Sequence, residues 1–326
     1  MGPNTEPSVP SPNTVVAREL IVGVVATVLF FLSVAMIPVF GIFAGVFTPL
    51  PTLLVYYRWG SPLAFWIPGG AAVLGCLLLV FLDLSQSLPY LLEMLLLGFV
   101  LGMGMRRNWS LEWTVGSASL LVFSLGTAVF LLTSEGGTES SALQLERDLR
   151  ETVAMILQSY GSASPDKHAV EEAFQKILPL LLKLLPGAAL SSTLMACWLN
   201  LVVAKRYCRV HQLAMPAWPE WKQWKAPDFM VWIVIAAGIT LLLPFGSIKI
   251  AGLNVLMVAG VIYLFQGLAI VSFYFERWKL PRIIRAFLYA VILIQQFLTL
   301  GAMLMGLFDI WVDFRRLSQG AGTTRG

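Results

Sequence analysis

Long apolar stretches take up more than half of the 326-residue chain and restrict its fold more than any other feature. They run over residues 20–39, 41–57, 62–82, 88–105, 113–133, 177–203, 229–245, 250–274 and 283–311. A helix needs roughly 20 apolar residues to cross the hydrocarbon core of a bilayer, and most of these stretches meet that length. The sequence therefore predicts an integral membrane protein.

Backbone hydrogen bonding decides the fold class. Lipid offers no hydrogen-bond partners, so each crossing must be a helix or part of a closed barrel. Barrel strands alternate apolar and polar residues, whereas the runs here are continuous. We therefore predict an all-α fold: a polytopic membrane helix bundle of about eight or nine transmembrane helices, with a short helical outer insert. The weakest crossing is 41–57, which is short and carries Pro49 and Pro51, so a broken or re-entrant segment is the alternative there.

Basic residues gather in every second loop between the crossings, and these loops share one side of the predicted bundle. Lys and Arg in short loops mark the cytoplasmic side. One side receives 13 of the 22: Arg18, Arg58, Arg106, Arg107, Lys205, Arg206, Arg209, Lys222, Lys225, Arg277, Lys279, Arg282 and Arg285. The acidic segment 134–176 falls on the other side, which we expect to face outward from a bacterial inner (cytoplasmic) membrane. Arg315 and Arg316 are an exception, because nine crossings place them outside, where we expect Asp309 and Asp313 to pair with them.

The polar segments divide the chain. We expect a disordered N-terminus at 1–18, a six-helix membrane unit at 19–205 containing the outer insert 134–176, and a cytoplasmic interfacial loop at 206–228, followed by a three-helix unit at 229–314 and a tail at 315–326. Within the insert, apolar spacing predicts an amphipathic helix over 142–160. A second helix should open at Pro165 and continue into the sixth crossing through a kink at Pro179.

The interfacial loop carries Trp218, Trp221 and Trp224, with Lys222 and Lys225 between them. Indole rings prefer the headgroup zone and Lys attracts anionic lipid, so this stretch should lie along the membrane surface.

Polar residues within the crossings are the candidate site, because an ionisable group there is costly. Glu93, Lys183 and Asp309 meet this criterion. With Tyr90, Asp83 and Gln86 they map to the outer half of the bundle, where they would line an outward-facing pocket. The alternative, that side chains this close to helix ends reach the interface, stays open.

Uncharged polar residues and paired glycines have a structural interpretation. Two four-residue glycine pairs, Gly41 with Gly45 and Gly98 with Gly102, permit close helix contact. Amides inside crossings more often join helices than bind ligands; they are Asn200, Asn254, Gln266, Gln295 and Gln296.

Motifs for chemistry are missing from the sequence. His168 and His211 have no ligand-spaced Cys or carboxylate partners, and the three cysteines are too scattered for a disulfide framework. No phosphate loop, nucleophile turn or zinc-protease motif occurs. We therefore expect no enzyme activity, no cofactor, no metal and no nucleic-acid partner. The expected partners are the lipid bilayer, a small-molecule solute and another membrane protein.

Three segments together resemble the YybS-like family of bacterial membrane proteins, a domain of unknown function. They are FTPLPTLLVYYRWG at 47–60, AMPAWPEWKQWKAPDFMVW at 214–232 and GLFDIWVDFRR at 306–316. The family is distantly similar to the substrate-capture subunits of energy-coupling factor transporters. That resemblance implies an outward pocket near Asp83, Tyr90 and Glu93. Such subunits dock their transport partner through an AxxxA pair on the first helix, and here residues 17–40 offer only Gly23 with Thr27.

Two functions follow from the sequence. The first is solute binding or transport through an outward-facing pocket around Glu93 and Tyr90. The second is a non-catalytic scaffold or assembly factor that works through the outer insert or the Trp and Lys loop.

Overall fold

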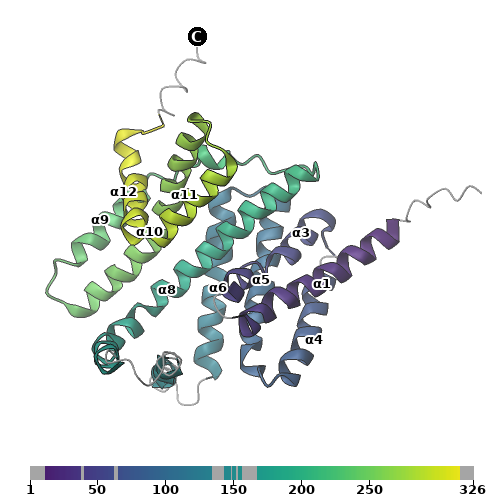
Figure 1. Ribbon diagram of the computed structural model, residues 1–326, viewed down its shortest axis with the longest axis horizontal. Helices are drawn as coiled ribbons and strands as arrows, with labels where there is room; N and C mark the ends of the chain where they lie inside the picture. Colours follow the sequence, from purple (N-terminus) through teal and green to yellow (C-terminus); the bar gives the residue numbers. More distant parts are fainter. Residues whose placement is uncertain are drawn as a thin grey trace, which may run out of the picture. The chain divides into compact units, whose positions relative to one another are not determined.

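The computed structural model describes residues 12–37, 40–61, 65–133, 143–147, 149–151, 153–155 and 167–315. Within these ranges the chain forms helices and turns without a strand, as the all-α prediction requires (Figure 1). The elements are α1 (Pro12–Met36), α2 (Phe40–Gly45), α3 (Leu50–Trp59), α4 (Trp66–Phe81), η2 (Ser85–Ser87), α5 (Leu88–Arg106), α6 (Leu111–Thr133), α8 (Lys167–Val210), η3 (Trp221–Gln223), α9 (Met230–Thr240), α10 (Gly246–Arg277), α11 (Arg282–Ile294) and α12 (Gln296–Val312).

Five helices of the described chain are long and apolar enough to cross a membrane, or up to six if α11 and α12 form one bent span. The five spans are Val16–Val34, Leu88–Arg106, Leu111–Leu132, Glu171–Val210 and Gly246–Arg277. The count of eight or nine is thus not confirmed. Two of the predicted crossings are broken helices, and α4 and α9 have 16 and 11 residues. At 1.5 Å per residue, these two helices fall short of the roughly 30 Å hydrocarbon core.

The two breaks have different causes. Residues 46–49 form a turn between α2 and α3, and proline occupies the first turn of α3, where its missing N–H costs nothing. The broken alternative for 41–57 is therefore confirmed. Between α11 and α12 the axis bends by 98° at Gln295, which has an extended backbone. The Thr299 hydroxyl donates to the carbonyl of Ile292 at 2.6 Å, supplying a donor at the break.

The termini and the insert differ in part from expectation. α1 begins at Pro12, so residues 12–18 are helical rather than disordered, while residues 1–11 lie outside the described chain. The predicted insert helix 142–160 is helical wherever it is described, at 143–147, 149–151 and 153–155. Pro165 lies outside the described residues. α8 continues from the insert into the sixth crossing through Pro179, as predicted.

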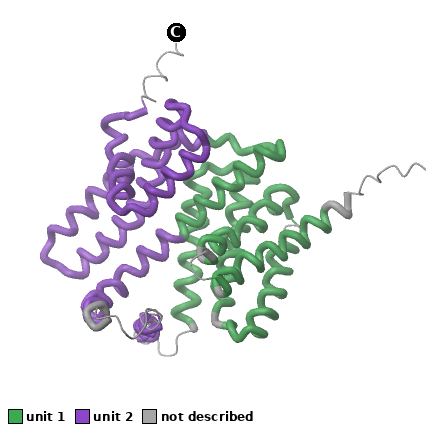
Figure 2. The backbone as a smooth tube through the Cα atoms, viewed as in Figure 1, with its two compact units in different colours: residues 1–133, 193–218 green, residues 134–192, 219–326 purple. Residues whose placement is uncertain are grey.

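The chain divides into two compact units (Figure 2). Unit 1 comprises residues 1–133 and 193–218, and unit 2 comprises residues 134–192 and 219–326. The first part of α8 thus belongs to unit 2 and its last part to unit 1. The predicted six-helix unit, 19–205, instead contains α8 up to Lys205.

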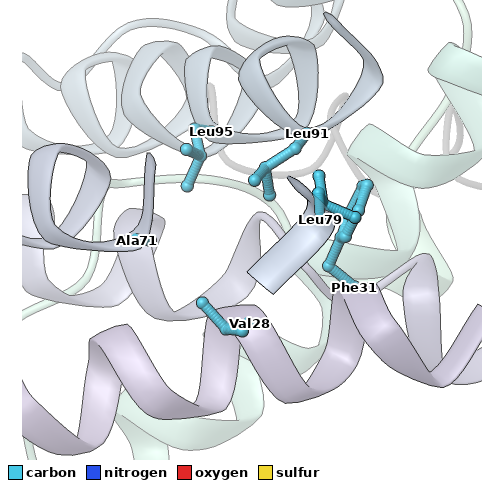
Figure 3. Packing of buried hydrophobic residues seen from close by; sticks show 6 residues of the cluster. All are labelled: Val28, Phe31, Ala71, Leu79, Leu91 and Leu95. Atoms are coloured by element: carbon cyan, nitrogen blue, oxygen red, sulfur yellow. The ribbon is translucent and has the colours of Figure 1, made fainter. Parts of the chain in front are cut away.

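Unit 1 has a core of hydrophobic side chains from three helices (Figure 3). Val28 and Phe31 come from α1, Ala71 and Leu79 from α4, and Leu91 and Leu95 from α5. Each is less than 7% exposed.

Glycine pairs bring neighbouring helices of unit 1 together, as predicted. A Cβ on Gly98 would lie 2.3 Å from the carbonyl oxygen of Pro49, and one on Gly102 would lie 2.8 Å from that of Leu53, so α5 packs directly against the α3 backbone. Gly41 likewise lets α2 approach the backbone of α1 at Ser33.

Basic and aromatic residues gather at one end of unit 1, which we call the basic end. Arg106 donates to the carbonyl of Tyr57 at 3.2 Å, and the Tyr57 hydroxyl donates to the carbonyl of Ala214. The Trp218 indole donates to the carbonyl of Trp109 at 2.7 Å. Loops that follow α3, α5 and α8 therefore meet at one end, as the alternation of basic residues predicts.

In unit 2, α10 packs against α9 and α12. Its closest approach to α12 uses glycine from both helices. A Cβ on Gly267 would lie 1.9 Å from the Ala302 carbonyl oxygen, and one on Gly306 would lie 2.1 Å from that of Tyr263. Asn254 of α10 also joins α8, because its side chain accepts from the Gly187 N–H at 2.6 Å and donates to the Lys183 carbonyl at 2.9 Å. The predicted helix-joining role of this amide is confirmed.

Candidate functional site

The residues predicted to line an outward pocket belong to two different units. Asp83, Gln86, Tyr90 and Glu93 lie in unit 1, around the turn from α4 to α5. Asp83 is exposed and occupies a turn with φ of 57°, a conformation that Asp tolerates better than most residues. Gln86 lies in η2, with its side chain outside the described part. The Tyr90 ring lies 5.9 Å from the ring of Phe31. These four residues therefore share one end of unit 1.

Glu93 faces a neighbouring helix. A Cβ added to Gly126 of α6 would lie 2.6 Å from its Oε1 atom, so the absent side chain at Gly126 leaves room for the carboxylate. Glu93 is half-buried, and α5 packs against α6. The Glu93 carboxylate therefore lies in the contact between α5 and α6, whether or not it also binds a ligand.

Lys183 and Asp309 lie in unit 2 and are not brought together. The Lys183 backbone contacts Asn254 of α10, whereas Asp309 contacts Gln266 of the same helix. Twelve residues of helix separate these contacts, a rise of about 18 Å. Lys183 is exposed and Asp309 is buried. They cannot line one pocket.

Asp309 belongs to a buried ion pair with Arg315. Its Oδ2 atom lies 2.7 Å from Arg315 Nη2, and the two side chains are 1% and 0% exposed. The Gln266 amide donates to Oδ2 at 3.1 Å, and the Phe314 N–H donates to Oδ1 at 3.0 Å. Asp313, in the left-handed conformation at the end of α12, turns the chain so that Arg315 returns to the carboxylate. Pairing of Asp309 with the tail is therefore confirmed.

This pair also holds the interfacial loop. Arg315 Nη1 donates to the carbonyls of Lys222 and Trp224, at 2.8 and 2.9 Å. The Ala226 N–H donates to the Gln266 side-chain oxygen at 3.1 Å. We call Asp309, Arg315, Gln266 and the backbone of 222–226 the buried clamp.

The clamp corrects the predicted location of the tail. Arg315 had been placed on the opposite side of the membrane from Lys222, but the two are in contact within unit 2. Asp309 likewise lies with the basic loop rather than in the outer half. The prediction is wrong because it requires a straight crossing over 283–311, whereas the chain bends by 98° at Gln295.

At the surface of the clamp, Lys222 lies 2.9 Å from Glu220 and 3.0 Å from Glu276. Its hydrogen bonds to Glu220 and Glu276 raise the pKa of Lys222.

A groove of about 530 Å³ opens in unit 1 between α1, α3 and the end of α8. We call it the α1–α3 groove, and its lining residues are Arg18, Glu19, Val22, Gly23, Ala26, Leu50, Pro51, Leu54, Val55 and Tyr207. Its charged lining residues, Arg18 and Glu19, lie at one end of the stretch of α1 that lines the groove, which we call the mouth, and most of the other lining residues, which we call its walls, are apolar. From Arg18 to Ala26 the groove follows α1 for eight residues, a rise of about 12 Å.

The mouth of the groove joins the basic end of unit 1. Glu19 Oε1 lies 2.5 Å from Arg58 Nη1, with side chains 29% and 33% exposed, and its Oε2 accepts from the Trp59 indole at 2.8 Å. The Arg58 guanidinium also lies over the Trp59 ring, 5.1 Å from its centre. Arg18 is exposed beside this cluster. Sequence reasoning missed the groove, although Arg18 and Glu19 at the start of an apolar helix are a signal that could have marked its mouth.

Metal binding is not indicated by the arrangement. Within the described ranges, no cluster of three or more His, Cys, Asp or Glu side chains is placed to hold an ion. Cys197 is buried beside Ser119, 3.3 Å from its hydroxyl.

Comparison with known proteins identifies one family model, described as "Predicted membrane protein (DUF2232)", which matches residues 24–310. No curated protein and no solved structure matches the chain.

Proposed function

Because the chain belongs to this DUF2232 family of predicted membrane proteins, we propose that it is of solute-binding or transport type and holds an amphiphilic small molecule in the α1–α3 groove. Membrane association itself is supported by the family and by the long apolar helices.

The observation that carries the proposal is the groove's division into apolar walls and a charged mouth. Binding sites for small molecules are concave, mostly apolar and supplied with a few polar groups that orient the ligand. The α1–α3 groove has a volume within the usual range of such sites, and its polar groups are Arg18, Glu19 and Tyr207. An amphiphile would match both parts.

The proposal moves the binding site away from the end of unit 1 that carries Asp83, Tyr90 and Glu93. The groove opens at the basic end, which by the distribution of Lys and Arg we assign to the cytoplasm of a bacterial cell. The likeness to the YybS-like family and to substrate-capture subunits stays a prediction. It favours solute binding, but the outward pocket that it implies is not the site chosen here.

We propose a binding function and not an enzymatic one, because the residues that line the groove do not include a nucleophile, a base and an orienting group that could act as one set. The alternative function is that of a scaffold or assembly factor, which acts through a protein partner. In that case no molecule would bind selectively in the groove.

Photo-crosslinking in bacterial membranes tests the proposal. A diazirine-bearing residue replaces Leu54 in the groove, and a control variant carries it at Leu29, which lies on α1 outside the groove and is 62% exposed. We expect Leu54 to capture a restricted set of amphiphiles, identified by mass spectrometry, while Leu29 captures bulk membrane lipid. The same molecules in the same proportions at both positions would refute selective binding and favour the scaffold.

A further inference from the structure

The charge at the mouth of the α1–α3 groove points to the class of its ligand. Glu19 is engaged by Arg58 and by the Trp59 indole, so its negative charge is already compensated. Arg18 is exposed and forms no ion pair with any residue that the structure describes. The mouth therefore carries an excess of positive charge, and it attracts an anion.

The walls of the groove require a long apolar group on the same ligand. Val22, Leu54 and Val55 line it, and the chain around Val22 lies within the span Val16–Val34. The groove runs about 12 Å along α1, close to the roughly 15 Å thickness of one hydrocarbon leaflet. One acyl chain of a membrane lipid has this reach.

Tyr207 places the mouth at the headgroup level. Tyr prefers the interface between hydrocarbon and water, where its ring is apolar and its hydroxyl is wet. Tyr207 lines the groove and packs against His211 with ring centres 4.2 Å apart. Arg206 and Arg209 of the same helix are exposed next to it. A ligand with its head beside Arg18 and Tyr207 would thus lie at the natural depth of a phospholipid.

From this geometry we propose that the α1–α3 groove is a binding site for an anionic phospholipid, with one acyl chain between α1 and α3 and the phosphate beside Arg18. This inference rests on the proposed function and narrows its ligand. Basic sites between transmembrane helices on the cytoplasmic side commonly recognise such headgroups.

Native mass spectrometry of the purified full-length protein tests the ligand class. The protein is equilibrated in mixed micelles containing equal amounts of phosphatidylglycerol and phosphatidylcholine with identical acyl chains. We expect phosphatidylglycerol adducts to be retained in preference. Equal retention of the two lipids would overturn the inference.

Two variants locate the site, and a third controls for charge. Arg18→Gln should lower retention of phosphatidylglycerol by about fivefold, the effect of one basic side chain near an anionic surface. Arg107→Gln makes the same charge change at an exposed residue that does not line the groove, and it should leave retention unchanged. Leu54→Trp fills the groove and should lower retention of both lipids. Equal effects of the two arginine substitutions would contradict the site.

Inorganic phosphate separates a lipid site from a simple anion site. Millimolar phosphate should not displace the lipid, because it cannot fill the apolar walls. Displacement would overturn the assignment to a lipid. An uncharged amphiphile captured selectively at Leu54, together with equal retention of the two lipids, would leave the proposed function standing while this inference fails.

Discussion

Two arginine–carboxylate pairs, one in each unit, have the same chemistry and opposite surroundings. Glu19 and Arg58 in unit 1 are about one third exposed, at the mouth of a groove. Asp309 and Arg315 in unit 2 are fully buried and make further hydrogen bonds to the backbone and to Gln266. An exposed pair in water contributes little to stability and can exchange partners with a ligand. A buried pair cannot lose one member without leaving a charge in low dielectric. The first arrangement therefore suits binding, and the second holds the fold.

The largest expected effect comes from breaking the buried pair. Arg315→Met should lower the free energy of unfolding by about 3–5 kcal/mol, because Asp309 stays buried without its counter-charge. The measurement is unfolding of the purified protein by a denaturing detergent. Arg58→Met is the control in unit 1, and a loss as large as that of Arg315→Met would remove the contrast between the pairs.

A double variant sharpens this result. Asp309→Leu combined with Arg315→Met removes both charges, and we expect it to recover much of the stability lost in Arg315→Met. Failure to recover would show that the hydrogen bonds to the loop at 222–226, more than the charge balance, hold unit 2 together.

The next effect tests how much the close contact between α10 and α12 contributes to stability, apart from the ion pair. Gly306→Ala places a Cβ within 2.1 Å of the Tyr263 carbonyl oxygen, so the α10 backbone must move, at a cost of about 1–3 kcal/mol. Gly301→Ala, on the same helix, has open space around it and should be neutral or slightly stabilising. Thermal unfolding of both variants in one detergent gives the comparison. Equal stabilities would mean that the close approach is not required.

Breaking the exposed pair at the groove should affect binding more than stability. Glu19→Gln should lower the free energy of unfolding by only about 0.2–1 kcal/mol, the usual contribution of an exposed ion pair. It also frees the charge of Arg58 at the mouth, so retention of phosphatidylglycerol should rise. Both are read from the same purified sample, by unfolding and by native mass spectrometry. A fall in retention would mean that Glu19 itself contacts the ligand.

The smallest effect concerns Lys222 on the surface of the clamp. Lys222→Met should cost about 0–1 kcal/mol, because both of its carboxylate partners are more than half exposed. The folded pKa of Lys222 is raised, so its contribution is present below the ordinary Lys pKa of about 10.4 and is lost as pH rises through the folded value. Unfolding at a series of pH values measures the difference. A difference that grew with pH would contradict this sign.

The predictable parts of the fold were those governed by local rules. Continuous apolar runs identified the helices, Pro49 and Pro51 marked the break before α3, and Gly98 with Gly102 located a close helix contact. The bend at Gln295 was not predictable, because the residue is neither proline nor glycine and no local motif marks its extended backbone. That one bend decided where Asp309 and Arg315 lie.

The candidate site was harder to predict than the fold, since burial cost alone does not say what a polar group faces. Glu93 and Asp309 were both selected by that cost, yet Glu93 packs against Gly126 and Asp309 is neutralised by Arg315. The groove depends on the spacing between α1 and α3, which are separated by the turns around α2 and have no local signal that fixes their distance.

Gln266 gives the clamp a chemical vulnerability. Its amide nitrogen donates to Asp309 while its oxygen accepts from the Ala226 N–H, so both ends of the group are in use. Deamidation would convert this side chain to a glutamate and place two carboxyl groups about 3 Å apart, where both cannot be ionised without strong repulsion. Deamidation of Gln266 alone would thus weaken the attachment of the loop 222–226 to α10 and α12.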